Sequence, residues 1–92
     1  MDIDYQKKAI IPGTVMHREL QGESVLLNLD SEYYFGLDEV GSRMWNALAT
    51  SDTISMAFAT LINEYDVDPD QLKHDLDNLL QKLIEAGLIE LA

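Results

Sequence analysis

Cysteine is absent from these 92 residues, so neither disulfide bonds nor thiolate zinc sites can stabilise the fold. Basic residues are scarce: six Lys and Arg stand against 17 Asp and Glu, which gives a net charge of −11. A charge of this sign repels phosphate backbones and anionic lipid heads, and it argues against nucleic acids and membrane surfaces as partners. No apolar run is long enough to cross a bilayer, and no basic segment leads into an apolar stretch as in a signal peptide. We expect a cytoplasmic protein that is stabilised by packing.

The length of the chain predicts one domain. A chain of this size buries only about 60–65% of the surface that it exposes when unfolded, which leaves little room for a deep active site. Hydrophobic residues make up 47% of the sequence, as in folded domains rather than in disordered acidic tails. Because Pro12-Gly13 marks a turn, we expect an N-terminal lead-in at residues 1–13 and the domain at residues 14–92.

The first part of this domain has the pattern of β-strands. Residues 14–20 and 24–30 predict two strands, joined by a short hairpin loop that contains Gly22. In the second strand three apolar residues share one face: Val25, Leu27 and Leu29. After a polar turn, the aromatic content of residues 33–37 predicts a third strand. The three strands are expected to form a small antiparallel sheet.

From Asp38 onward the apolar spacing becomes helical and predicts three helices, with N-caps at Asp38, Thr53 and Asp68. The third helix has clear boundaries, since Pro69 suits its first position and Gly87 suits the left-handed position after its end. Its apolar stripe consists of Leu72, Leu76, Leu79, Leu80, Leu83 and Ile84. Residues 88–91 have room for a final short strand or tail.

This order of elements predicts an α+β, winged-helix-like fold in which a three-stranded antiparallel sheet is followed by a three-helix bundle. In a DNA-binding winged helix the third helix would enter the major groove. Here acidic residues outnumber Lys73 and Lys82 on that helix, so like charges would meet. An acidic winged-helix DNA-binding regulator therefore stands only as an alternative function, beside a structural adaptor that dimerises through a strand edge.

Residues suited to catalysis are few. The two histidines, His17 and His74, belong to no nucleophile–base motif, and the sequence has no phosphate-binding loop, HExxH motif or EF-hand spacing. Helical spacing could bring a metal-binding group together from Asp70, His74, Asp77 and Asn78. A solvated helix face explains that spacing better, because such spacing often arises by coincidence. We expect no enzyme activity, no cofactor and no metal.

The aromatic triplet Tyr33-Tyr34-Phe35 lies in the third predicted strand. Adjacent strand residues point to opposite faces, so a one-sided core cannot explain all three aromatic side chains. Two interpretations remain open at this point. In one, Phe35 is buried and a tyrosine is half exposed, as tyrosines often are; in the other, the aromatic side chains form a ledge beside a strand edge.

The segments VLLNLD (residues 25–30) and YYFGLDEVGSRMW (residues 33–45) resemble the PqqD family. Its members are coenzyme PQQ synthesis protein D and the precursor-peptide recognition elements of ribosomal peptide natural-product pathways. The leucine spacing of residues 72–88 resembles the family's closing helix, so the resemblance covers residues 14–91. The sequence around Phe35 and Gly36 is most similar to that of stand-alone members from lasso-peptide pathways. Residues 49–52 lack a glycine that many relatives carry in this turn, which changes a loop but hardly touches the resemblance.

The resemblance implies a non-catalytic protein that binds the leader of a ribosomally made precursor peptide. It would present that leader to a modifying enzyme: a radical-SAM protein, a protease or a cyclase. The leader would add as a strand to the third strand and lie against the third helix. A free strand edge offers unpaired N–H and C=O groups, and alternate side-chain pockets supply specificity. The expected peptide-binding residues are Tyr33, Tyr34, Phe35, Gly36 and Leu37 on the strand, with Lys73, Leu76, Asp77 and Leu80 on the helix.

Several of these assignments have a simpler interpretation that remains open. Lys73 could pair with an acidic leader residue, or it could make a local i, i+4 contact with Asp77. Leu76 and Leu80 have the spacing of ordinary core leucines. Gly36 is expected to allow close approach of another backbone. Whether the free protein is a monomer or a homodimer stays open as well.

Overall fold

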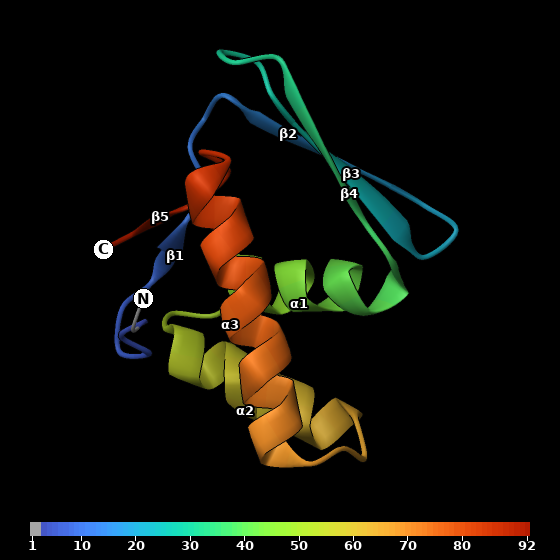
Figure 1. The fold of residues 1–92 in the computed structure, drawn as a ribbon, viewed down its shortest axis with the longest axis vertical. Helices are drawn as coiled ribbons and strands as arrows, with labels where there is room; N and C mark the ends of the chain where they lie inside the picture. Colours follow the sequence, from blue (N-terminus) through green and yellow to red (C-terminus); the bar gives the residue numbers. More distant parts are fainter. Residues whose placement is uncertain (1–2) are drawn as a thin grey trace.

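A computed structural model describes residues 3–92 of the chain, in which a small sheet packs against three helices (Figure 1). The sheet has the strand order β2-β3-β4 and is antiparallel throughout. Its strands are β2 (Val15–Leu20), β3 (Glu23–Asn28) and β4 (Tyr33–Leu37). The helices are α1 (Glu39–Thr50), α2 (Ile54–Glu64) and α3 (Pro69–Glu85). Two further short strands, β1 (Ala9–Ile10) and β5 (Glu90–Leu91), pair with each other. The predicted α+β fold is confirmed.

The turn between β2 and β3 follows from its sequence. Gln21 and Gly22 form a two-residue loop between the paired residues Leu20 and Glu23. Both loop residues have positive φ, 54° and 84°, which is the backbone of a type I′ hairpin turn. Gly22 adopts this conformation without strain. The turn thereby determines the register of β2 on β3.

Each predicted helix start is confirmed by a side chain that accepts a hydrogen bond from the first turn. The Asp38 carboxylate accepts from the backbone N–H of Gly41 at 2.7 Å, and Thr53 accepts from Met56 at 3.2 Å. Asp68 does the same at the start of α3. Such caps each stabilise a helix by about 1 kcal/mol. The C-terminal end of α3 also follows the prediction, because Gly87 has a φ of 71° and the N–H of Leu88 donates to the carbonyl of Leu83 at 2.9 Å.

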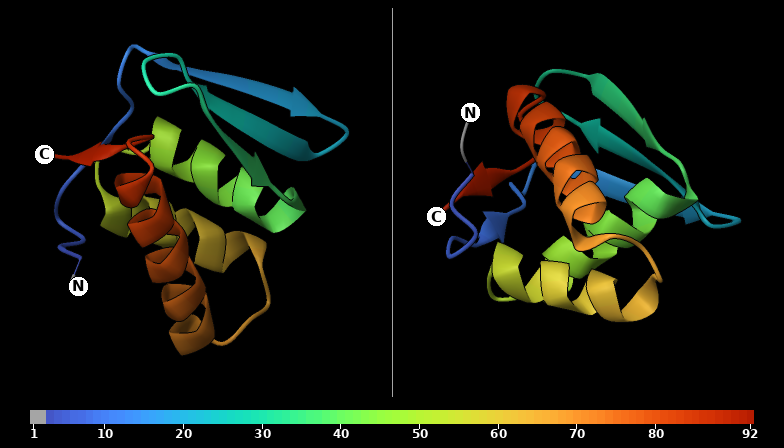
Figure 2. Two further views of the ribbon diagram at one scale, coloured as in Figure 1. Left: turned by 45° about the horizontal axis from the view of Figure 1, so that its top comes forward. Right: turned by 60° about the horizontal axis from the view of Figure 1, so that its bottom comes forward.

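The core lies between the sheet and the helices. Leu26 on β3 is fully buried, and α3 contributes four leucines to the same cluster: Leu72, Leu76, Leu80 and Leu83. The face of β3 that carries Val25, Leu27 and Leu29 is therefore the one turned away from the helices. Figure 2 shows the sheet as one layer, with the helices on one side of it.

A small polar network ties the sheet to α1, running from the exposed His17 to two buried serines. The Nε2 atom of His17 lies 3.0 Å from the hydroxyl of Ser24, and Ser24 is hydrogen-bonded to Ser42 on α1. The His17 ring also packs 5.9 Å from the Trp45 ring, measured between centroids. Because both serines are buried, their hydroxyls need these partners to avoid the cost of an unsatisfied polar group.

The lead-in predicted over residues 1–13 contains a short strand, β1, that the sequence does not predict. Ala9 and Ile10 pair with Leu91 and Glu90, and the N–H of Lys8 donates to the carbonyl of Ala92 at 2.9 Å. A two-residue strand is too short for an alternating pattern to mark it. The side chains of Ile3, Tyr5 and Ile11 pack against the core.

Tyr5 fastens this N-terminal segment to α3. Its hydroxyl donates to the Asp77 carboxylate at 2.6 Å, and its ring packs edge-on against Phe58. Burial, together with the hydrogen bond and the negative charge of Asp77, raises the pKa of the Tyr5 hydroxyl well above its ordinary value. Burial also raises the pKa of Asp77, but hydrogen bonds from Lys73 and Tyr5 outweigh burial and leave it below its ordinary value.

We predict that Tyr5→Phe lowers the free energy of unfolding by about 1 kcal/mol at neutral pH, because the hydrogen bond to Asp77 is lost. The raised pKa sets the pH dependence. Above pH about 10 the unfolded tyrosine ionises while the folded one stays neutral, so the advantage of the wild type shrinks. Urea unfolding at pH 7 and at pH values above 10 measures both effects. An equal difference at all these pH values contradicts the assignment.

Candidate functional site

A groove runs along one flank of the molecule between β4 and α3. One hollow of about 430 Å³ lies between Tyr33 and Phe35 on the strand and Lys82 and Glu85 on the helix. A second hollow of about 370 Å³ continues it toward the start of α1. Phe35 and Lys82 line both hollows, so the two are parts of one surface. We call it the β4–α3 groove, and its main lining residues are Tyr33, Phe35, Leu37, Asp75, Asn78, Leu79, Lys82 and Glu85.

The groove continues into an apolar hollow at its far end. This hollow, of about 190 Å³, shares Val40, Met44 and Asp75 with the second one. Its other apolar walls come from Tyr65 and Leu72, together with Val67 in the loop between α2 and α3. The groove therefore passes from an aromatic region at β4 to a mixed aliphatic and aromatic region between α1 and α3.

The aromatic residues of β4 divide between the two faces of the sheet. Phe35 is half-buried against the core and Tyr33 is exposed beside it, with ring centroids 6.5 Å apart. Tyr34 points to the other face and is exposed. Both interpretations of the triplet hold in part: Phe35 packs inside, and Tyr33 adds exposed aromatic surface to the groove.

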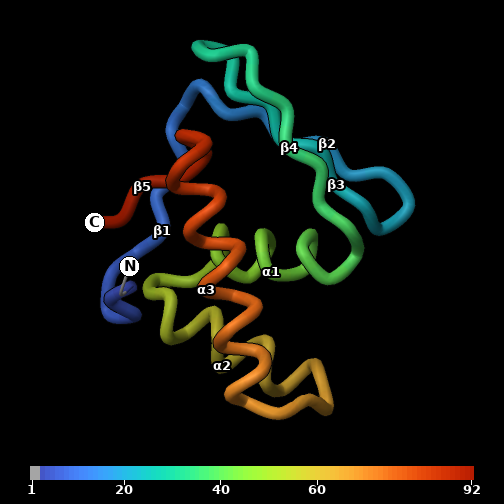
Figure 3. The backbone as a smooth tube through the Cα atoms, viewed as in Figure 1, coloured from blue at the N-terminus to red at the C-terminus, as the bar shows by residue number. Residues whose placement is uncertain are grey.

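The edge of β4 beside the groove is free. Within residues 3–92, β4 pairs only with β3, so one row of its backbone N–H and C=O groups has no strand partner. The chain leaves β4 through a tight bend into α1 (Figure 3). No β3 residue lines either of the two larger hollows, so the groove lies on the free side of β4, where this backbone row is exposed.

The structure places the predicted residues of α3 away from this groove. Leu76 and Leu80 are fully buried in the core and offer no surface to a ligand. They are the ordinary core leucines that their spacing also allowed. The Lys73 Nζ atom lies 2.9 Å from an Asp77 carboxylate oxygen, so the local i, i+4 contact is present. The same nitrogen lies 5.1 Å from the centre of the Tyr5 ring. Lys73 and Asp77 therefore face the N-terminal segment rather than β4.

Two further residues of the predicted site lie on β4. Leu37 is buried, so its side chain contributes to the core more than to the groove. Gly36 has no heavy atom within 4 Å of where a Cβ would stand. The space beside Gly36 is therefore open, and the close approach of another backbone expected there stays a prediction.

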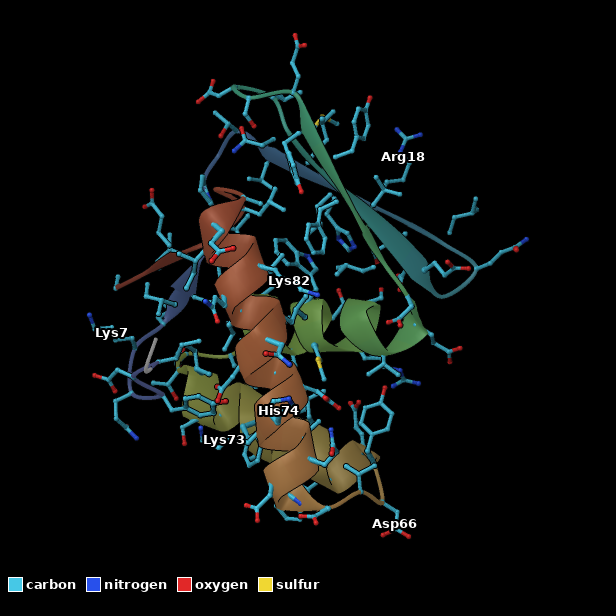
Figure 4. The ribbon with its side chains drawn as sticks, viewed as in Figure 1. Lys7, Arg18, Asp66, Lys73, His74 and Lys82 are labelled. Carbon is cyan, nitrogen blue, oxygen red and sulfur yellow. The ribbon has the colours of Figure 1, made fainter. Side chains whose placement is uncertain are left out.

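The groove-lining residues of α3 that sequence reasoning missed are Asp75, Asn78, Leu79, Lys82 and Glu85. Counted from Asp75, they stand at positions i, i+3, i+4, i+7 and i+10, which is the spacing of one helix face. That face lies beside the buried leucine stripe. Lys82 is exposed and forms no ion pair with another residue in the range 3–92. Figure 4 shows Lys82 on the part of α3 nearer to the sheet, and Lys73 farther down the helix beside α2.

The described residues offer little for catalysis or metal binding. His17 lies at hydrogen-bonding distance from Ser24, but Ser24 and Ser42 are only 2% and 1% exposed and cannot reach a substrate. In the range 3–92 no three His, Asp or Glu side chains gather closely enough to hold a metal ion. None of the helices there combines the length and apolar character needed to span a membrane.

The family model described as coenzyme PQQ synthesis protein D (PqqD) matches residues 23–89 of the chain. The chain belongs to the PqqD family. The match includes β3, β4, all three helices and therefore both walls of the groove. Among curated protein sequences, no significant match to this PqqD-family chain is found.

A solved structure is also similar to this PqqD-family chain. It is described as TbiB1 in complex with the TbiA(beta) leader peptide. The TM-score is 0.81 and the sequence identity is 34%, over 88% of this chain and 94% of the other. The two chains thus share the arrangement of sheet and helices over nearly their whole length.

The neighbouring residues Leu79 and Leu80 test how α3 is divided between core and groove. We predict that Leu80→Ala lowers the free energy of unfolding by about 3 kcal/mol, because a fully buried side chain leaves a cavity. Leu79→Ala, at the half-buried groove wall, should cost only about 1 kcal/mol. Urea unfolding of both variants gives the comparison. Equal losses would contradict the assigned rotation of the helix.

Proposed function

We propose that this protein binds the leader of a ribosomally made precursor peptide in the β4–α3 groove and presents it to a modifying enzyme. The single observation that carries the proposal is the free edge of β4 alongside the groove. The similarity to TbiB1, whose solved structure contains a leader peptide, supports the same function. The protein itself acts without a catalytic group or a cofactor.

In the proposed complex the leader adds as a fourth strand to β4. Its backbone satisfies the N–H and C=O groups that β4 leaves unpaired, which gives affinity largely independent of sequence. Every second side chain of the leader then points toward α3. Tyr33 and Phe35 on the strand, and Leu79 on the helix, form apolar walls for those side chains.

Charge and shape along the groove supply selectivity. The hollow at Val40, Met44 and Leu72 fits an apolar leader residue. Lys82, at the junction of the two larger hollows, fits an acidic one. The role first assigned to Lys73, pairing with a leader carboxylate, passes to Lys82 because Lys73 is engaged by Asp77.

The class of the partner enzyme is inferred from the family resemblance and not from the shape of the groove. The sequence around Phe35 and Gly36 resembles members from lasso-peptide pathways, which favours a leader protease and a cyclase over a radical-SAM protein. We place this encounter in the cytoplasm, where precursor peptides are made. In each experiment below, the leader is that of a precursor peptide encoded beside the gene for this chain.

Strand addition can be tested on the peptide without altering the protein. We predict that N-methylation of leader residues at alternate positions, within the segment that pairs with β4, weakens binding at least about tenfold, because those N–H groups donate to the strand. Methylation at the intervening positions should change affinity much less. Calorimetric titration measures both series. Equal sensitivity at all positions contradicts strand addition.

The same complex should be visible on the protein. Amide resonances of residues 33–37 should shift when the leader is added, and Phe35→Asp should weaken binding by placing a charge in an apolar wall. No shift and no binding at micromolar protein concentration would overturn the proposed function.

Charge reversal distinguishes the two lysines of α3. We predict that Lys82→Glu weakens binding of a leader with an acidic residue opposite it by about tenfold, since attraction becomes repulsion. Lys73→Glu is the matched control and should leave affinity within about twofold, because Lys73 lies beside Tyr5 rather than in the groove. Fluorescence anisotropy with a labelled leader measures both. A larger effect from Lys73→Glu restores the original assignment.

A further inference from the structure

The face of the sheet turned away from the helices is apolar and exposed. Cross-strand pairing puts Met16, Leu27 and Tyr34 in one row and Arg18, Val25 and Gly36 in the next. Leu20 and the exposed Glu23 form a third row at the hairpin end, and Leu29 continues the alternation past the end of β3. We call this surface the outer sheet face, consisting of Met16, Leu20, Val25, Leu27, Leu29 and Tyr34 around Arg18. All but the half-buried Leu27 are largely exposed.

The outer sheet face differs in charge from the rest of this acidic protein. Residues 30–92 carry thirteen acids against three bases, whereas residues 14–29 carry only Glu19, Glu23 and Arg18 with a formal charge. Arg18 makes no ion pair with any residue of the range 3–92. Figure 4 shows it directed away from the helices. The face thus has an unpaired cation, Arg18, among its apolar side chains and one carboxylate, Glu23, at its hairpin end. Such a patch suits a protein surface that is itself apolar and offers a carboxylate opposite Arg18.

The size of the face decides how such a partner could bind. Three strands about 4.8 Å apart, each of five or six residues rising about 3.3 Å, cover only about 300 Å². A stable interface usually needs about 800 Å² on each partner. A leader added to β4 would widen the sheet by one strand and place every second leader side chain beside Tyr34. The widened face comprises both this chain and the peptide.

We propose that the enzyme that modifies the precursor peptide docks on the outer sheet face. It contacts the apolar side chains around Arg18 and the outward-facing side chains of the bound leader at the same time. This inference rests on the proposed function and adds a second surface to it, on the side of β4 opposite the groove. Tyr34, which points away from the groove, belongs to this surface and not to the peptide pockets.

A second copy of the chain fits this face less well. Two chains of net charge −11 repel each other, and the bare face of three strands is too small to offset that repulsion. The enzyme, by contrast, gains about 100 Å² from the leader strand, and it reaches the area of a stable interface by also contacting leader residues beyond the sheet. Bound leader then raises the affinity of the chain for the enzyme, and bound enzyme raises its affinity for the leader by the same factor.

The experiment compares two methionines with nearly the same exposure. Met16 on the outer sheet face is 51% exposed and Met56 on α2 is 52% exposed. The proteins are the wild type, Met16→Glu and the matched control Met56→Glu. The probes are the precursor peptide encoded beside this gene and the modifying enzyme encoded with it. Calorimetry measures the affinity of each protein for the leader. Surface plasmon resonance measures the affinity for the enzyme, with and without leader. Analytical ultracentrifugation measures the oligomeric state.

The inference predicts that Met16→Glu binds the leader within about twofold of the wild type but binds the enzyme at least about tenfold more weakly. Met56→Glu should match the wild type in both. Removing the leader should weaken enzyme binding to the wild type by at least about tenfold.

Three results would overturn the inference. Unchanged enzyme binding by Met16→Glu, with leader binding intact, removes the outer sheet face while leaving the proposed function standing. A wild-type dimer that Met16→Glu dissociates assigns the face to a second copy. A wild type that binds no leader overturns the proposed function, and the inference with it.

Discussion

The buried leucine stripe of α3 sets the rotation of the helix, and most of the functional surface depends on that rotation. With Leu76, Leu80 and Leu83 fully buried, the residues at 75, 78, 79 and 82 share one flank of the helix, and this flank lies beside β4. The residues at 73 and 77 share the other flank, where Tyr5 meets them. Turning the helix by one residue, about 100°, would withdraw its leucines from the core. The position of the helical wall of the groove is therefore a consequence of core packing.

The sequence was sufficient for those parts of the fold that local chemistry determines. Three N-caps, the Gln21-Gly22 hairpin and the Gly87 stop are recognisable because each depends on residues within a few positions of one another. The helix boundaries and the antiparallel sheet follow from these signals. The pairing of β1 with β5 does not, because its residues lie about 80 positions apart and only two on each strand take part.

The candidate site was predictable on the strand but not on the helix. Period-two alternation already places Tyr33 and Phe35 together on β4 and separates them from Tyr34. On α3 the leucine pattern identifies the buried face but not which flank lies beside β4. That choice depends on how the helix crosses the sheet, a tertiary fact with no local signal. The sequence pattern therefore predicts Lys73 and Asp77 as peptide-binding residues, although Asn78, Leu79 and Lys82 line the groove.

The pairing of β1 with β5 brings residues near the two ends of the described chain together. Lys8 and Ala92 exchange backbone hydrogen bonds in both directions, at 2.9 and 3.0 Å, and Figure 1 shows β1 and β5 side by side. The fold is thus nearly a closed loop. Because Lys8 and Ala92 lie side by side, the fold suits insertion within a larger enzyme or circular permutation.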